Sequence, residues 1–240
     1  MHHPATPAPL ALAARLVRRT AGQAVPLLAL AVCAGGLLGF ILMVEGLEGD
    51  GHRFDQAVLL ALRQPGAPAE PIGPAWLALT MRDITALGGI PVLSLFGLLA
   101  LGYLMLARQW RAVWLLVVSL PGGLLLNTVL KQGFDRPRPE LVAHLVEVHT
   151  NSFPSGHAML SAIGFLTLGA LLAGATQRRH HQGYILGVAV LLTLLVGTSR
   201  VYLGVHWPTD VLAGWCLGAA WATGCWLLLH AGPVVWRKPR

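Results

Sequence analysis

Three short segments of this chain gather reactive and charged side chains at the ends of long apolar runs. The segments are residues 131–139, 154–157 and 199–210. Their candidate functional side chains are three cations, two histidines, one carboxylate and one hydroxyl: Lys131, Arg138, Arg200, His157, His206, Asp210 and Ser155. Ionisable groups beside apolar spans are costly and usually functional. The pattern therefore predicts a membrane-embedded site that holds an anion and reacts with it.

The three cations have the chemistry of a phosphate-binding set. Arginine binds phosphate oxygens in a bidentate manner, and lysine acts as a point charge. Arg138 lies between Pro137 and Pro139, which stiffen the backbone and disfavour helix, so we expect it on a rigid extended segment. A single basic residue at a span end could simply reach the lipid headgroups. Three together favour phosphate binding.

The second segment, Pro154-Ser155-Gly156-His157, precedes an apolar run and predicts the start of a helix. Ser155 is a candidate N-cap, and Gly156 would let a ligand approach the backbone. The free N–H groups and positive dipole end of a helix N-terminus favour phosphate oxygens. Simple capping by Ser155 is the alternative role, and it is compatible with phosphate binding.

The third segment carries a candidate reactive pair, His206 and Asp210, four residues apart across Pro208. If a helix begins near Pro208, the carboxylate can lie close to the imidazole ring. It would then fix the tautomer and leave the other ring nitrogen available as a nucleophile or a base. A purely structural histidine–aspartate hydrogen bond is the alternative.

Two histidines and an aspartate could also suggest a metal site. Three cations in the same site would repel a divalent ion, and they supply the charge neutralisation that a metal would provide. We therefore expect no metal and no other cofactor.

The composition indicates a membrane protein. Of the 240 residues, 55% are hydrophobic and 11% are charged, with a mean hydropathy of +0.64. Soluble domains are about a quarter charged. The net charge of +7 is not organised into a basic face with interleaved aromatic residues, so a nucleic-acid partner is not expected. The expected partners are the bilayer and a lipid phosphate substrate, and the sequence does not define an oligomeric state.

The apolar runs predict an all-α, polytopic membrane protein, because a membrane-spanning helix needs roughly 20 apolar residues. Six transmembrane helices are expected, at about 24–44, 89–107, 112–130, 157–175, 184–200 and 209–230. Residues 45–88 are expected to form a periplasmic or interfacial segment with two short interfacial helices, at about 54–63 and 76–87, separated by the Pro/Gly-rich stretch 65–74. A packed loop is the alternative for this segment. Residues 1–20 are expected to form a loose cytoplasmic N-terminus. The whole chain, 1–240, is expected to be one domain.

The distribution of charge predicts the orientation. With a cytoplasmic N-terminus, ten of the 17 Lys and Arg residues fall on the cytoplasmic side. This agrees with the positive-inside rule. All ten acidic residues then fall on the outer side. Both termini are expected to be cytoplasmic, and the three segments are expected to face outward.

The three segments together resemble the signature of the type 2 phosphatidic acid phosphatase (PAP2) superfamily of membrane lipid phosphatases. Its pattern is K-x6-RP, PSGH and SR-x5-H-x3-D. Here it is complete, as Lys131 to Arg138-Pro139, Pro154 to His157, and Ser199-Arg200 with His206 and Asp210. The motif region covers roughly residues 127–215. The resemblance implies a phosphatase in a bacterial plasma (inner) membrane, acting at the outer face.

The resemblance also implies a role for each residue. His206 would attack phosphorus, Asp210 would orient His206, and His157 would protonate the leaving oxygen and later activate water. The phosphate oxygens would be held by Lys131, Arg138, Ser155, Gly156 and Arg200.

Two other functions remain open at this stage. A phosphotransferase could pass the same phosphoryl group to another acceptor, and a transport or binding protein would need only the cations. The lipid is also open: an isoprenyl pyrophosphate such as undecaprenyl pyrophosphate, phosphatidylglycerophosphate, phosphatidate and a lipid A phosphate all fit.

Overall fold

The computed structural model describes residues 9–47, 50–148 and 150–230 and contains eight helices and one short hairpin in these ranges. The elements are α1 (Pro9–Glu45), α2 (Asp50–Ala61), β1 (Arg63–Gln64), β2 (Ala67–Pro71), α3 (Ala75–Ala86), α4 (Ile90–Leu106), α5 (Trp110–Gly133), α6 (Gly156–Gly174), α7 (Arg179–Tyr202) and α8 (Pro208–His230). Residues 9–20, expected to be loose, belong to α1. The rest of the predicted N-terminal segment, residues 1–8, lies outside the described residues.

The helical, membrane-spanning architecture confirms the predicted fold class. Five helices have the length and hydropathy of membrane spans, and the pair α3 and α4 passes the same test together, with a 45° bend between them. The α4 helix has 17 residues on its own. The segment 76–87, predicted as an interfacial helix, therefore forms a bent helix pair with the second predicted span, and the break lies at residues 87–89.

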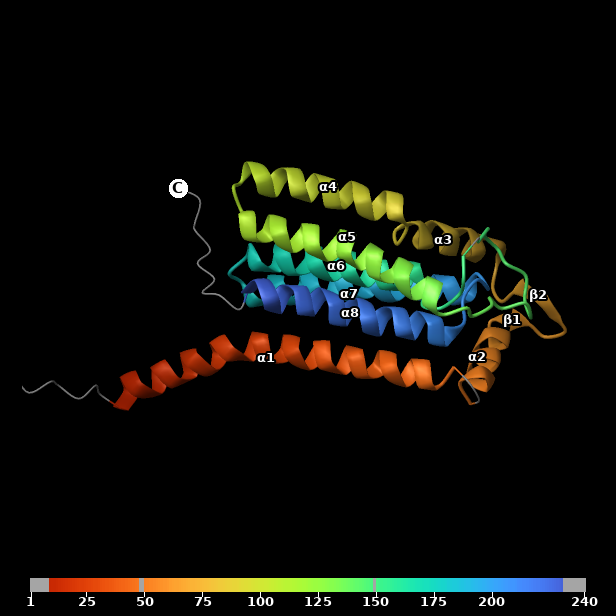
Figure 1. Ribbon diagram of the computed structural model, residues 1–240, viewed down its shortest axis with the longest axis horizontal. Coiled ribbons are helices and arrows are strands. Elements are labelled where there is room, and N and C mark those ends of the chain that lie inside the picture. Colours follow the sequence, from red (N-terminus) through yellow and green to blue (C-terminus); the bar gives the residue numbers. More distant parts are fainter. Residues whose placement is uncertain (1–8, 48–49, 149, 231–240) are drawn as a thin grey trace, which may run out of the picture.

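The helix α6 lies at the centre of the bundle, with α5, α7 and α8 packed around it (Figure 1). Small residues allow this close packing, as is usual between membrane helices. A Cβ added at Gly164 would lie 2.9 Å from Leu93 of α4, and one at Gly169 would lie 2.8 Å from Ala189 of α7. The α1 helix packs against α8 at the edge of the bundle.

The connection between α1 and α4 gathers at one end of the bundle, where α2, the hairpin and α3 lie together (Figure 1). The hairpin was not predicted. Its strands are antiparallel, with Arg63 opposite Pro71, and Gly66 in the turn has a φ of 78° that favours glycine. Because α5 and α7 run toward this end and α6 and α8 start from it, all three motif segments meet there.

Candidate active site

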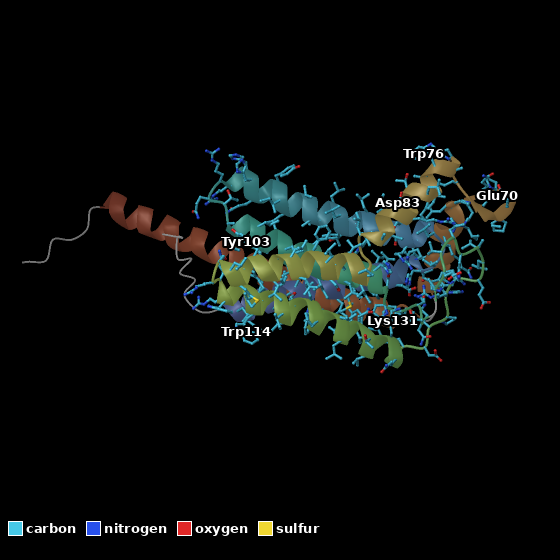
Figure 2. All side chains as sticks on the ribbon, turned by 90° about the horizontal axis from the view of Figure 1, so that it is seen from above. Glu70, Trp76, Asp83, Tyr103, Trp114 and Lys131 are labelled. Carbon is cyan, nitrogen blue, oxygen red and sulfur yellow. The ribbon has the colours of Figure 1, made fainter. Side chains whose placement is uncertain are left out.

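The three motif segments converge at the end of the bundle that carries α2 and α3 (Figure 1). Lys131 lies in the last turn of α5, Arg200 in the last turn of α7, and His157 in the first turn of α6. Figure 2 shows Lys131 toward the end of the bundle that carries Trp76 and Asp83, away from Tyr103 and Trp114. The turn after α7 contains Gly204, whose φ of 76° allows the chain to reverse before His206 and α8. The fold therefore assembles side chains from four spans and two loops.

His206 and Asp210 form a buried pair, with Nδ1 of the ring 3.4 Å from Oδ2 of the carboxylate. Nη1 of Arg138 lies 3.2 Å from Nε2 on the other side of the ring. A guanidinium can only donate, so Nε2 must be the acceptor and the neutral ring carries its proton on Nδ1, facing Asp210. Burial, followed by the charges of Arg138, Arg200 and Lys131, holds the pKa of His206 well below its usual value. The ring is therefore neutral at pH 7.

Asp210 is held rigidly by groups other than the histidine. Its Oδ2 accepts hydrogen bonds from the Ser152 hydroxyl at 2.5 Å and from the Trp207 N–H at 2.9 Å. Its Oδ1 accepts from Nη1 of Arg136 at 2.5 Å. These bonds occupy both carboxylate oxygens and fix their direction, so the carboxylate can fix the ring in turn.

The three predicted phosphate-binding cations lie around this pair. Nζ of Lys131 donates to the Asn151 carbonyl at 2.5 Å, and Nε of Arg138 donates to the Thr150 carbonyl at 2.7 Å. Nη1 of Arg200 donates to the Thr85 hydroxyl at 3.1 Å, and its buried Nε has no partner. Among the described residues, none of the three cations forms an ion pair with a carboxylate. Their positive charge is therefore available to an anion.

Ser155 occupies the N-cap position of α6, as predicted, but its hydroxyl makes no capping hydrogen bond. The Oγ is buried without a partner. A Cβ at the next residue, Gly156, would lie 3.0 Å from the Asn127 amide oxygen and 3.5 Å from Cε of Lys131. Only glycine leaves this approach to the helix N-terminus open. The unpartnered hydroxyl beside it is free to bind a ligand oxygen.

A cavity of about 480 Å³ opens at this position. His157, Gly156, Lys131, Asn127, Thr150 and Asn151 are among the polar and backbone groups on its wall. A second, almost wholly apolar cavity of about 290 Å³ lies between α4, α5 and α6. The two share the wall residues Ile90, Leu124 and Leu160, so the cavity beside Lys131 and His157 continues into an apolar groove.

A known protein family matches the part of the chain that carries these residues. The sequence model of the PAP2 superfamily matches residues 112–232, which is half of the chain. Phosphatidylglycerophosphatase B of Bacillus subtilis is 37% identical over 145 residues, covering 60% of this chain and 70% of that protein. The chain belongs to the PAP2 superfamily. The resemblance seen in the sequence is thereby confirmed, and the relative just named is a phosphatase.

A solved structure and a second relative mark the extent of the similarity. The crystal structure of a transmembrane PAP2 type phosphatidylglycerolphosphate phosphatase from Bacillus subtilis superposes with a TM-score of 0.70 at 30% identity, covering 81% of this chain and 94% of that one. An undecaprenyl-diphosphatase of Sulfolobus acidocaldarius is 47% identical over 68 residues, which is 28% of this chain and 29% of that protein. The PAP2 fold thus covers most of the chain.

Several residues of this PAP2 site were not singled out by sequence reasoning. Ser152 lies just before the second motif and contacts both members of the His206–Asp210 pair. Thr85, at the end of α3, binds Arg200. Asp55, in α2, reaches the site through Arg136. Nothing in the spacing of these residues marked them, because their partners lie far away in the sequence.

Proposed function

We propose that this PAP2 protein is a metal-independent phosphatase that hydrolyses a lipid phosphate or pyrophosphate through a phosphohistidine at His206. The observation that carries the proposal is the state of the His206 ring. It is neutral, its Nδ1 faces Asp210, and its Nε2 points toward uncompensated cations. A nucleophile needs an electron pair that can attack phosphorus, and the unprotonated Nε2 supplies one once Arg138 turns to the phosphate.

In the first step, Nε2 of His206 attacks phosphorus, and the bond from phosphorus to the leaving oxygen breaks. His157 gives a proton to that oxygen. Asp210 stabilises the positive charge that develops on the His206 ring. In the second step, His157 takes a proton from water, the water oxygen attacks phosphorus, and the bond from phosphorus to Nε2 breaks. Inorganic phosphate leaves, and both histidines return to their starting states.

Phosphate oxygens would be held by Lys131, Arg138 and Arg200, with the Ser155 hydroxyl and the Gly156 N–H. Fixed cations and donors lower the barrier most when they face the charge that forms in the transition state. The three cations of this site neutralise the charge of the phosphate, as a divalent ion does in other phosphatases, so the reaction needs no metal.

The apolar groove supports a lipid as the substrate. It meets the polar cavity at Ile90, Leu124 and Leu160, and it is lined further along by residues such as Leu93, Leu98 and Leu120. A lipid tail can lie in this groove while the phosphate reaches His206. The relatives' names support two of the four lipid classes in particular, phosphatidylglycerophosphate and undecaprenyl pyrophosphate.

Phosphate release by the purified protein in detergent with excess EDTA tests the proposal. Four lipids should be compared: phosphatidylglycerophosphate, undecaprenyl pyrophosphate, phosphatidate and a lipid A phosphate. We expect the wild type to release phosphate from at least one of them, and His206→Ala to release none.

Activity that is lost in EDTA and restored by a divalent ion would contradict metal independence. Release by His206→Ala at the wild-type rate would contradict the assignment of the nucleophile. Transfer of the phosphoryl group to an alcohol, without free phosphate, would point to a phosphotransferase.

A further inference from the structure

The helix α2 contributes a buried carboxylate to the N-terminus of α8, although the two lie more than 150 residues apart in the sequence. Asp55 is fully buried. Its Oδ1 accepts the Thr209 N–H at 2.8 Å, and its Oδ2 accepts the Thr209 hydroxyl at 2.6 Å. The helix dipole also stabilises a carboxylate that lies beside the N-terminus of a helix, as Asp55 lies beside that of α8. Asp55 thus fixes α2 to the turn of α8 that carries Asp210.

Arg136 connects the Asp55 carboxylate to Asp210. Its Nη2 lies 2.6 Å from Oδ2 of Asp55, and its Nη1 lies 2.5 Å from Oδ1 of Asp210. The same Nη1 lies 2.8 Å from the Thr209 hydroxyl, and the guanidinium packs over the Trp207 ring at 5.7 Å from its centroid. Arg136 lies two residues before Arg138 on the segment between α5 and α6. It is committed to two carboxylates and does not line the cavity that holds His157.

The charge balance of this group bears on the reaction. One guanidinium, Arg136, lies between two carboxylates, Asp55 and Asp210, so the three side chains carry a net charge of −1. During attack, the His206 ring becomes positive and gains from a negative neighbour. Without Asp55, Arg136 would pair with Asp210 alone, and the net charge of these two side chains would be zero. Asp55 therefore leaves Asp210 negative toward His206.

We infer that Asp55 is a positioning residue for the proposed reaction. It acts through Arg136 to keep the Asp210 carboxylate aligned and negatively charged toward His206. The inference rests on the proposed function, because it assigns Asp55 a role in the step in which His206 attacks. It makes the connection between the first two spans a part of the active centre. Asp55 itself touches neither the cavity nor the His206 ring.

The test replaces Asp55 by asparagine, which keeps the shape and most hydrogen bonds but removes the charge. We expect kcat to fall about 10- to 100-fold, because the lost stabilisation of the positive His206 ring acts only in the transition state. The KM and the inhibition constant of inorganic phosphate should change less than about 2-fold, because the phosphate-binding cations are untouched. Asp83→Asn is the matched control: it removes an exposed carboxylate from α3 and should leave kcat unchanged.

A double variant separates this role from a structural one. Asp55→Asn with Arg136→Gln restores the net charge of −1 on the group, whereas Arg136→Gln alone makes it −2. If Asp55 acts through Arg136, the double variant should recover part of the kcat that Asp55→Asn loses. A purely structural clamp would instead make kcat follow Tm through all three variants, because residues in contact are coupled in stability as well. This comparison also serves if Asp55→Asn alone does not fold, because the double variant is then compared with Arg136→Gln.

Wild-type kcat in Asp55→Asn, with His206→Ala inactive, would overturn this inference and leave the proposed phosphatase intact. A raised KM with unchanged kcat would overturn it as well, since Asp55 would then act on binding. Turnover by His206→Ala would overturn the proposed function itself.

Discussion

The His206 ring has two nitrogens in different environments, and this difference decides what each can do. Nδ1 faces the Asp210 carboxylate, which is held by Ser152, Trp207 and Arg136. Nε2 faces Arg138. When a phosphate enters, the Arg138 guanidinium can turn its N–H groups to the phosphate oxygens and leave Nε2 free to react. The same residue would then hold the ring in the empty site and the substrate in the occupied one.

The neutral state of His206 predicts a dependence of stability on pH. Its folded pKa lies well below its unfolded value of about 6.5. Below about pH 6.5 the unfolded chain takes up a proton that the folded chain does not, so the free energy of unfolding falls as the pH falls. The contribution reaches about 1.4 kcal/mol per pH unit at most. Thermal unfolding in detergent should therefore give a lower Tm at pH 5 than at pH 7.5.

His206→Asn is the control for this measurement, because asparagine does not titrate. The variant should lose Tm less steeply than the wild type as the pH falls. An identical slope in both proteins would show that His206 is not the group that takes up the proton.

Ser155→Ala tests whether the unpartnered hydroxyl binds phosphate. Hydrogen bonds to charged groups are worth about 1.5–3 kcal/mol, so the inhibition constant of inorganic phosphate should rise about tenfold or more. Stability should not change, because the hydroxyl makes no capping bond. Ser161→Ala, which removes a hydroxyl bound to the Ala158 carbonyl in the same helix, is the control. A lower Tm with unchanged phosphate inhibition would instead assign Ser155 a capping role.

Sequence reasoning singled out the residues that are proposed to contact the substrate, because their types are rare at span ends. It could not identify the residues that support them. Asp55 lies in a helix with polar neighbours such as His52, Arg53 and Gln56, so its type is not unusual there. Its burial depends on α8 packing above it, and that contact spans 154 residues. Only the folded chain shows which of these polar residues is buried.

At the scale of elements, the break between α3 and α4 brings the backbone close to the site. A Cβ at Gly88 would lie 3.1 Å from the His157 carbonyl and 3.4 Å from Cβ of Ser161, and it would collide with Val196. A Cβ at Gly89 would lie 3.9 Å from Nε2 of His157. The break therefore covers the histidine that is proposed to protonate the leaving group.

Gly88→Ala should force these neighbours apart. Overpacking of this kind costs about 1–3 kcal/mol, so Tm should fall, and activity should fall because the His157 backbone moves. Gly102→Ala in α4 is the control, because a Cβ there meets nothing within 4 Å. Equal Tm and activity in the two variants would show that the break does not constrain α6.

The spans were predictable to within a few residues, except the start of the α7 span, because lipid requires long apolar helices. The α3–α4 bend was not predicted, since residues 45–88 were assigned to an interfacial segment and the second span was expected to begin at about residue 89. The hairpin was not predicted either. Strands of two and five residues are too short for an alternating pattern to be recognised in the sequence.

At the scale of the molecule, the site lies at one end of the bundle, and the connections α4–α5 and α6–α7 lie at the other (Figure 1). The connections at this other end carry no Asp or Glu, and Arg108, Arg111, Arg178 and Arg179 lie in or beside them. The positive-inside rule then favours an outward-facing site. This orientation would give the enzyme access to lipid phosphates exposed on the outer leaflet.

Labelling with a membrane-impermeant maleimide tests the orientation. In a background with Cys33, Cys216 and Cys225 replaced by alanine, Glu70→Cys should react in intact cells. Gln177→Cys, in the connection between α6 and α7, should react only after lysis. The reverse pattern would place the site on the cytoplasmic side.

The central claim, covalent catalysis by His206, is tested most directly by trapping the phosphoenzyme. The purified protein in EDTA is mixed with a radiolabelled lipid phosphate and quenched rapidly in alkali. We expect label on the peptide that carries His206, stable in alkali and lost in acid, and none on His206→Ala. Rapid turnover without label on the protein, or label that persists in His206→Ala, would contradict it.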